Sequence, residues 1–213
     1  MIDLILIGGG GHGVSVVSVI ESLGNYRIAG ILDAAIPVGE KVLGYQVVGT
    51  DTDIPYWVKQ GAQFVVGVGQ IGSGTARRRT FNLVKQHGGV LPVLIASTAW
   101  VSKHAVLGEG TVVFHRGIVN TRARIGENNI INTGAIIEHD VVIGDDNHIS
   151  TSVTVNGDCT IGNNNFLGCG SIVHHRLSIA DNIIVGAGAV VVKSCLEQGT
   201  YIGVPARKLG IGA

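Results

Sequence analysis

The chain has 213 residues, a length that suits one large or two small domains, and only 14% of them are charged. This apolar composition predicts a packed core and excludes a disordered chain. Lys plus Arg and Asp plus Glu number 15 each, so no net charge draws the protein toward nucleic acid or an anionic membrane, and we expect neither as a partner. The 33 glycines are roughly double the average share, which indicates many tight corners.

The N-terminal residues and the cysteines indicate a cellular compartment. Residues 1–20 are apolar but include Asp3, a glycine loop and His12, so we expect neither a secretion signal nor a membrane span. Cys159, Cys169 and Cys195 are an odd number without metal-ligand spacing. We interpret them as small buried residues of a cytoplasmic protein, and we expect no metal.

Short apolar runs alternate with helical patterns in the first part of the chain. The pattern predicts strands at residues 2–7, 26–32, 64–68 and 90–94, and helices at residues 14–23, 51–60 and 73–87. Such alternation is typical of a parallel sheet with helices packed against it. We therefore predict a Rossmann-like α/β domain over residues 1–95.

A glycine loop joins the first predicted strand to the first predicted helix. Residues 8–13 satisfy G-x-G-x-x-G, and Asp33 ends the next strand near the spacing that the dinucleotide fingerprint requires. Glycines let a phosphate approach the backbone, and a helix N-terminus presents free N–H groups to it. Because 95 residues hold only half of the arrangement that a dinucleotide needs, we favour a sugar nucleotide over NAD.

Each of four residues near this loop has two possible interpretations. His12 either donates a hydrogen bond to a diphosphate or sugar, or is a solvated residue at a helix start. Asp33 either accepts from a ribose hydroxyl or sugar amine, or only makes the loop soluble. Gly69 and Gln70, after the third strand, are expected at the same rim in this topology, with or without a contact to the ligand.

The remaining residues follow a period of six. From Val101 to Val191, every sixth position is Val, Ile or Leu. A helix does not bury one residue in six as its only stripe, and antiparallel strands alternate in twos. A parallel β-helix fits, because three hexapeptides make one triangular coil, with glycine or asparagine at corners that need positive φ. We predict such a prism over residues 96–213.

Residues eighteen apart lie on top of one another in this prism, so His139, Gly157 and His175 share one edge. His139 also belongs to the densest titratable cluster of the repeat, between Glu138 and Asp140. A neutral imidazole beside a carboxylate suits a general base near neutral pH. A solvated or stacking histidine is the alternative interpretation.

Over nearly its whole length the chain resembles one branch of the left-handed β-helix acyltransferases. This branch comprises sugar acetyltransferases with a small nucleotide-sugar-binding domain before the prism: UDP-N-acetylbacillosamine synthesis enzymes, GDP-perosamine N-acetyltransferases and sialic acid O-acetyltransferase-like proteins. The resemblance is carried by Ile7-Gly8-Gly9-Gly10-Gly11-His12-Gly13, Asn132-Thr133 with Ile137-Glu138-His139-Asp140, Ile143-Gly144-Asp145 with His148-Ile149-Ser150, and Gly203-Val204-Pro205-Ala206-Arg207.

The resemblance implies a left-handed prism that binds acetyl-CoA, and it implies a role for each matching residue. His139 is the expected general base and Asp140 the residue that raises its basicity, while the role of Glu138 is less clear. The expected acetyl-CoA contacts are His148, Gly157, Cys169 and Ala187, and the expected sugar-nucleotide contacts are Gly10, Gly11, His12, Asp33, Ala34 and Gly69. The resemblance also implies a homotrimer whose adjacent subunits share each site.

The position of Gly157 in the prism gives a second reason to expect glycine there, because a side chain one coil beyond His139 would obstruct a pantetheine arm. Some relatives have two acidic residues where this chain has Asp33 and Ala34, which leaves the nucleotide and the sugar open.

The expected reaction is direct transfer of an acetyl group from acetyl-CoA to the 4-amino group of a nucleotide-linked amino-deoxysugar. No cysteine has an adjacent base in the sequence, so we expect no acyl-enzyme. The alternatives are O-acetylation of a sugar of the sialic acid type and a noncatalytic sugar-binding scaffold. A bare scaffold has no need of the glycine loop, which argues against the last.

Overall fold

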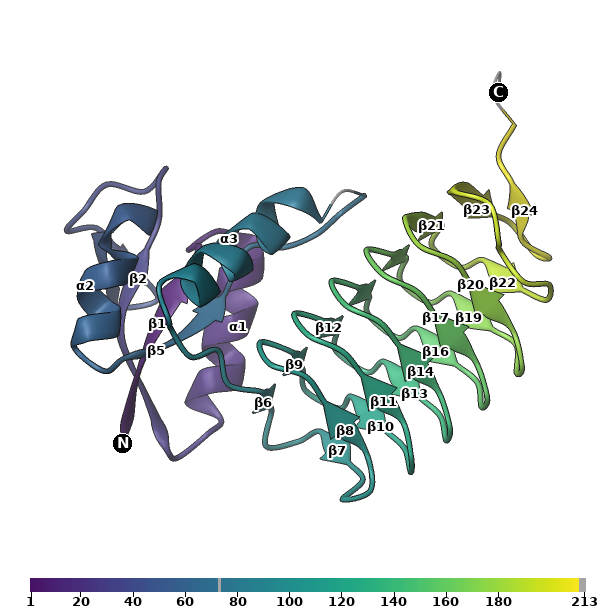
Figure 1. Cartoon of the computed structure of the whole chain (residues 1–213), viewed down its shortest axis with the longest axis horizontal. Coiled ribbons are helices and arrows are strands. Elements are labelled where there is room, and N and C mark those ends of the chain that lie inside the picture. The colour runs from purple at the N-terminus through teal and green to yellow at the C-terminus, as the bar shows by residue number, and fades with distance from the viewer. Residues whose placement is uncertain (73, 211–213) are drawn as a thin grey trace.

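The structure is a computed structural model that describes residues 1–72 and 74–210. An α/β domain lies at one end of a long prism of stacked coils (Figure 1). The predicted fold class, a Rossmann-like domain followed by a left-handed parallel β-helix, is confirmed.

The N-terminal domain is built on a five-stranded sheet with the strand order β3-β4-β2-β1-β5. β1 pairs in parallel with both β2 and β5, and β3 forms an antiparallel pair with β4. The elements are β1 (Ile2–Ile7), α1 (Gly11–Glu21), β2 (Tyr26–Leu32), β3 (Lys41–Val42), β4 (Tyr45–Gly49), the 3₁₀ helix η1 (Asp51–Asp53), α2 (Ile54–Lys59), β5 (Gln63–Val66) and α3 (Thr75–Gln86).

One prediction for this domain is wrong, and one pair of strands was not predicted. Residues 90–94 do not form its last strand, because Val90 makes only one bridge to Gln63 and Leu94 already pairs with Val112 of the prism. The hairpin of β3 and β4 was not predicted, since its short strands are half exposed and lack a regular apolar alternation. In addition, α1 begins at Gly11, inside the glycine loop.

Every strand of the prism belongs to one of three faces, and the strands within each face run parallel except for β24. Face 1 holds β6 (Leu94–Ile95), β9 (Val112–Val113), β12 (Ile130–Ile131), β15 (His148–Ile149), β18 (Phe166–Leu167), β21 (Ile183–Val185), β23 (Gly199–Ile202) and the antiparallel β24 (Arg207–Lys208). Face 2 holds β7 (Trp100–Val101), β10 (Ile118–Val119), β13 (Ile136–Ile137), β16 (Thr154–Val155), β19 (Ile172–Val173) and β22 (Val190–Val191). Face 3 holds β8 (Val106–Leu107), β11 (Arg124–Ile125), β14 (Val142–Ile143), β17 (Thr160–Ile161) and β20 (Ser178–Ile179).

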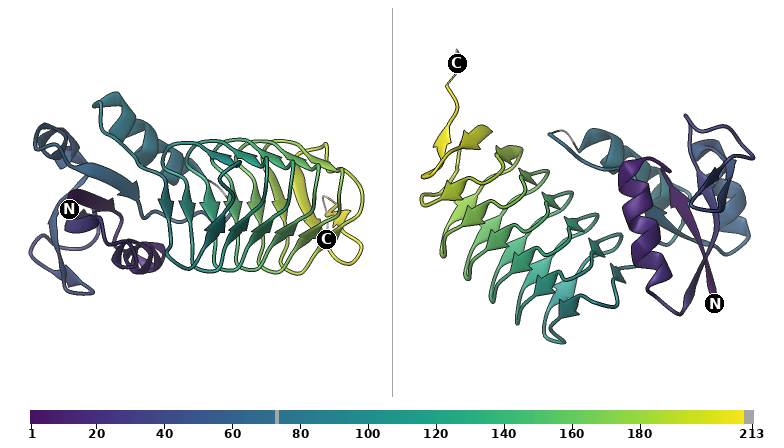
Figure 2. Two further views of the ribbon diagram at one scale, coloured as in Figure 1. Left: turned by 90° about the horizontal axis from the view of Figure 1, so that it is seen from below. Right: turned by 180° about the vertical axis from the view of Figure 1, so that it is seen from behind.

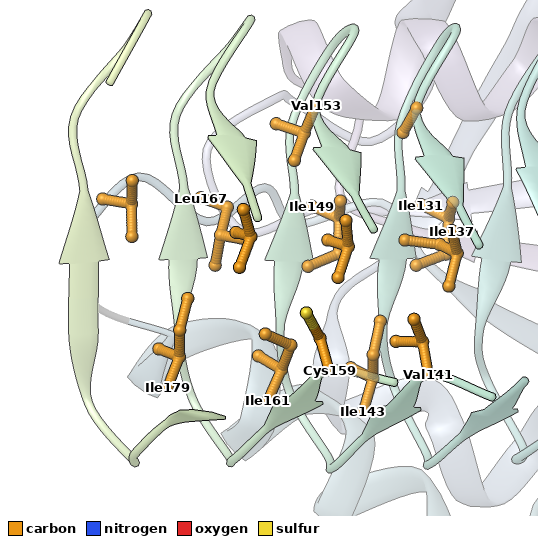
Figure 3. Close-up of a cluster of buried hydrophobic side chains, with 14 of the residues drawn as sticks. Ile131, Ile137, Val141, Ile143, Ile149, Val153, Cys159, Ile161, Leu167 and Ile179 are labelled. Atoms are coloured by element: carbon orange, nitrogen blue, oxygen red, sulfur yellow. The ribbon is translucent and has the colours of Figure 1, made fainter. Parts of the chain in front are cut away.

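The predicted six-residue ladder is the core of the prism. Its side chains point inward from all three faces and are almost completely buried (Figure 3). Strands pair with partners eighteen residues away, as Ile137 does with Val155. The chain passes from face 1 to face 2 to face 3, so the prism has three edges, which we call edge 1/2, edge 2/3 and edge 3/1.

The residues between the strands form the corners of the prism, and the prediction of glycine or asparagine at these corners needs one correction. Every sixth residue from Gly110 to Gly188 has φ between +55° and +69°, yet most of these residues are Asn, Asp, Ser or Arg rather than Gly. The glycines that follow the aliphatics serve another purpose. A Cβ on Gly144 would lie 2.9 Å from the carbonyl oxygen of Gly162, so these glycines allow the coils to stack.

The cysteine prediction is correct for two positions and wrong for the third. Cys159 and Cys195, four residues after the inward-pointing Val155 and Val191, are buried, but Cys169, two residues after Leu167, is exposed at edge 1/2. Burial raises the pKa of the Cys195 thiol to about 11. Within the part of the chain that the structure describes, no helix has the length and apolarity to cross a bilayer.

The N-terminal domain packs on face 1 and on the two edges that bound it (Figure 2). At edge 1/2, His115 Nε2 lies 3.3 Å from Ser18 Oγ of α1. At edge 3/1, Arg78 of α3 donates to Asp146 Oδ2 at 2.7 Å and Gln70 Nε2 donates to the Asp146 carbonyl at 3.1 Å. Edge 2/3 lies opposite face 1 in the triangular section, away from this contact.

Candidate active site

The glycine loop forms one wall of a pocket in the N-terminal domain. The pocket has a volume of about 520 Å³, within the usual range for small-ligand sites. Five of the six predicted sugar-nucleotide residues line it: Gly10, Gly11, His12, Asp33 and Gly69. Ala34 is exposed next to Asp33 and is not part of the lining.

Close backbone approach explains the glycines of the loop. A Cβ on Gly13 would lie 2.0 Å from the carbonyl oxygen of Gly8, whereas a Cβ on Gly10 or Gly11 would meet nothing within 4 Å. Gly13 therefore closes the turn, while Gly10 and Gly11 keep the mouth of the pocket open. α1 begins here without a side-chain cap or an acidic residue in its first turn, so its first N–H groups face the pocket unneutralised.

Asp33 holds the loop in place. Its Oδ2 accepts from the Gly9 N–H at 2.7 Å, and its Oδ1 accepts from the Ala35 and Ile36 N–H groups at 2.7 and 3.0 Å. Partial burial acts to raise the pKa of Asp33, but these three hydrogen bonds outweigh it and lower the pKa overall. Asp33 thus shapes the pocket as an ionised carboxylate.

His12 and His148 are neutral histidines at the junction of the two domains. Burial, with smaller contributions from Arg77 and the other imidazole, lowers the pKa of His12 to about 3. Burial also lowers the pKa of His148 to about 4. His148 Nδ1 donates to the Gln70 carbonyl at 2.6 Å and its Nε2 accepts from Asn132 Nδ2 at 3.0 Å.

The surroundings of His148 bear on its expected contact with acetyl-CoA. Its side chain is only 6% exposed, and both ring nitrogens are used within the chain. Its ring centroid lies 6.1 Å from that of His12, so the structure places it with the glycine-loop pocket. Gly157, Cys169 and Ala187 are elsewhere on the prism.

Arg77 is a buried cation that the sequence analysis did not single out. Its Nη1 donates to the carbonyls of Val66 and Val68 at 2.7 and 3.0 Å, and its Nε donates to the Asn128 carbonyl at 3.2 Å. Burial lowers its pKa to about 10, so it remains charged. It therefore ties the end of β5 to edge 3/1, beneath the glycine-loop pocket.

A second pocket lies on edge 2/3 around His139. Its lining includes Glu138, His139, Gly157, Asp158 and His175, as the eighteen-residue column predicts. A Cβ on Gly157 would lie 2.7 Å from both Cε1 and Nε2 of the His139 ring. No residue other than glycine leaves room for the imidazole at this position.

Asp140 orients the His139 imidazole. His139 Nδ1 lies 2.8 Å from Asp140 Oδ2, and because an ionised carboxylate only accepts, Nδ1 carries the proton. Nε2 therefore has its lone pair free and lies against Gly157. The side chain of His139 is 55% exposed, so a substrate can reach this nitrogen.

The carboxylate of Asp140 has a second partner. Arg122 donates from Nε to Oδ1 at 2.6 Å and from Nη2 to Oδ2 at 2.7 Å. This guanidinium, followed by His139, holds the pKa of Asp140 far below its usual range. Sequence reasoning missed Arg122, although the eighteen-residue column places it beside Asp140.

His139, Asp140 and Asp158 form the one group of potential metal ligands among the described residues, with donor atoms within 4.8 Å of one another. This grouping was not predicted, although the eighteen-residue column places Asp158 one coil beyond Asp140. Both oxygens of Asp140 already accept from Arg122, so a cation would have to displace the guanidinium.

The residues expected to bind acetyl-CoA divide between two edges. Gly157 lies on edge 2/3, whereas Cys169 and Ala187 lie on successive coils of edge 1/2. Gly188, next to Ala187, donates its N–H to the Cys169 carbonyl at 2.9 Å. Both edges flank face 2, so no single edge of one prism presents all three residues.

The comparison with known families agrees with both parts of the fold. Residues 3–84 match the PglD N-terminal domain, and residues 122–157 match the bacterial transferase hexapeptide family with six repeats. No curated protein matches the chain.

Solved structures match the chain from end to end. A histidine-to-asparagine variant of perosamine N-acetyltransferase from Caulobacter crescentus, in complex with CoA and GDP-perosamine, is 34% identical with a TM-score of 0.91, over 98% of this chain and 97% of that chain. The acetyltransferase domain of PglB from Neisseria gonorrhoeae, in complex with acetyl coenzyme A, is 30% identical with a TM-score of 0.90, over 97% and 98%. WeeI from Acinetobacter baumannii shares the fold at 22% identity and a TM-score of 0.86, over 98% and 100%.

Proposed function

The chain belongs to the hexapeptide-repeat sugar acetyltransferases that carry a PglD-type N-terminal domain, and from this we propose that it transfers an acetyl group from acetyl-CoA to the 4-amino group of a nucleotide-linked amino-deoxysugar. One observation carries the proposal. His139 presents an unprotonated Nε2 at an open pocket, held by Asp140 through its other nitrogen.

The proposed step is direct attack of the amine on the thioester. As the amine nitrogen bonds to the acetyl carbon, His139 Nε2 takes one of its protons, and a backbone N–H donates to the carbonyl oxygen. The C–S bond then breaks, and the protonated His139 returns its proton to the sulfur, so the coenzyme leaves as the thiol. The buried cysteines take no part, since burial raises the pKa of the Cys159 and Cys195 thiols.

The glycine-loop pocket is the proposed site for the nucleotide. The free N–H groups at the start of α1 suit a diphosphate, and Gly10, Gly11, His12, Asp33 and Gly69 surround it. The neutral His12 suits a hydrogen bond to the diphosphate or sugar. Ala34 lies next to Asp33 but does not line the pocket, and we propose no contact between its side chain and the nucleotide.

Acetyl-CoA is proposed to lie along edge 2/3 of one subunit and edge 1/2 of another. Gly157 leaves space for the imidazole of His139, and the pantetheine arm is proposed to pass beside this ring. Cys169 and Ala187 contribute from the other edge. His148 lies at the junction of the two domains. We propose that its hydrogen bond to the Gln70 carbonyl holds Gln70 in place at the glycine-loop pocket.

We propose a homotrimer from the position of these edges. His139 lies on the edge opposite the face that carries its own N-terminal domain, which favours service to the sugar nucleotide of an adjacent subunit. Face 2 supplies an apolar contact surface between the two edges, with Trp100, Ile118, Ile136 and Ile172 pointing outward. We place the active site between adjacent subunits, in a cytoplasmic protein whose three cysteines are free.

An acetyl-transfer assay tests the function. The protein is incubated with acetyl-CoA and a panel of amino sugars linked to UDP, GDP, dTDP or CMP, and free thiol and acetylated sugar are both measured. We expect thiol release that depends on one amino sugar nucleotide and matches the product formed. Equal or faster transfer to free sialic acid would replace the proposal with O-acetylation, and no thiol release with any acceptor would leave the scaffold interpretation.

A further inference from the structure

Arg122 holds the carboxylate that orients the proposed base. It lies one coil before Asp140 on edge 2/3, and its two guanidinium nitrogens bind the two oxygens of Asp140 side by side. Asp140 Oδ2 is shared, because it accepts from both Arg122 Nη2 and His139 Nδ1. The three side chains therefore form one chain of hydrogen bonds that ends at the free Nε2 of His139.

The backbone at Arg122 is an unfavourable place for a long side chain. Its φ is +61°, in the left-handed region that few residues other than glycine and asparagine adopt. Asp140 and Asp158 have φ of +61° and +60° on the next two coils, so the same corner conformation stacks their carboxylates close together. Two adjacent carboxylates repel, and Arg122 supplies the charge that holds one of them in a fixed orientation.

From this geometry we propose that Arg122 is a positioning residue for the proposed acetyl transfer: it locks the Asp140 carboxylate so that the His139 ring stays in one orientation and one tautomer. The proposal rests on the proposed function. A bidentate guanidinium fixes the plane of a carboxylate, which a lysine or a water molecule does not. Without it, the carboxylate is free to turn toward solvent and leave His139 Nδ1.

Arg122→Gly is the decisive variant, because glycine accepts the positive φ and the side chain that it removes is mostly exposed. Arg122→Lys keeps the charge without the planar fork. Asn182→Gly is the matched control, since Asn182 is an exposed residue with a φ of +58° at a corner of edge 3/1 and does not touch Asp140.

We expect kcat of Arg122→Gly to fall about tenfold while the KM for acetyl-CoA stays within about twofold, because orientation of the base is lost and coenzyme binding is not. Arg122→Lys recovers part of kcat, and Asn182→Gly behaves as the wild type.

Nitrogen-15 NMR of the His139 imidazole gives a readout that needs no substrate, with the signal assigned by its loss in His139→Ala. In the wild type we expect the Nδ1–H tautomer, and in Arg122→Gly a mixture of tautomers. If these spectra change but the wild type transfers no acetyl group, the positioning role stands and the proposed function falls. An unchanged tautomer and an unchanged kcat in a folded Arg122→Gly protein overturn the inference.

Discussion

His139 and Gly157 are in contact across successive coils of edge 2/3, with no room for a methyl group between the imidazole and the glycine backbone. The two residues are eighteen positions apart, and the strands that precede them, β13 and β16, are directly paired. The position of the ring therefore depends on the register of the prism, and the space beside it depends on a missing side chain.

Gly157→Ala tests this contact. The added methyl displaces the ring or blocks the arm of the coenzyme, so we expect kcat/KM for acetyl-CoA to fall about tenfold or more. The φ of Gly157 lies outside the left-handed region, so the backbone itself tolerates alanine. Gly24→Ala is the control, because a Cβ there meets nothing within 4 Å. Full activity in Gly157→Ala, measured by thiol release, would contradict the proposed position of the coenzyme.

His139→Ala tests the general base. A positioned base contributes roughly 10²–10⁴-fold, so we expect kcat to fall by that order while the affinity for the coenzyme hardly changes. Calorimetric titration with CoA measures the affinity separately from turnover. Turnover equal to that of the wild type would remove His139 from the mechanism.

Mixed trimers test whether adjacent subunits share a site. His139→Ala lacks the base but keeps the glycine-loop pocket, and Gly10→Trp fills that pocket but keeps the base. Tryptophan is tolerated at Gly10, since its φ of −70° and ψ of −170° are extended and a Cβ there meets no neighbour. After joint unfolding and refolding, random trimers should recover about a quarter of wild-type activity.

The two variants alone, refolded in the same way, are the controls and should stay inactive. A mixture that also stays inactive, although size-exclusion chromatography shows hybrid trimers, would mean that the base and the pocket belong to the same subunit. A monomer at assay concentration would contradict the trimer itself.

Acid should weaken the fold through the histidines at the junction of the domains. The pKa values of His12 and His148 are lowered to about 3 and about 4, whereas an unfolded histidine has a pKa near 6.5. As pH falls from about 6.5 to about 4, the unfolded chain binds protons that the folded chain does not bind, so the free energy of unfolding falls, on the order of several kcal/mol in total.

Urea denaturation at pH 7.5, 5.5 and 4.5 measures this change. His148→Gln removes one of the two titrating groups, so its free energy of unfolding should depend less steeply on pH than that of the wild type. An equal slope in the two proteins would show that His148 is not the residue responsible.

Local patterns in the sequence were enough to predict most of the fold. The ladder of aliphatics, the strands at residues 2–7 and 26–32 and the glycine loop all follow from periodicity or from backbone space within a few residues. The β3 and β4 hairpin and the true role of residues 90–94 were missed, because strands of two residues gain their stability from partners elsewhere in the chain.

The candidate site was predicted in part. The column rule predicted that His139, Gly157 and His175 share one edge, and five of the six residues predicted for the sugar nucleotide line the glycine-loop pocket. Arg77 was missed, since its partners are backbone carbonyls, which no sequence pattern marks.

The sequence alone determined the kind of molecule, because a six-residue apolar period and a glycine loop at a helix start are repeated or local features that need no distant partner. Only the tertiary structure decided that the proposed base lies on the edge opposite its own glycine-loop pocket, and that Arg122 binds both carboxylate oxygens of Asp140. These relations depend on the register of stacked coils and on where buried polar groups find their partners, and both are settled only when the whole chain packs.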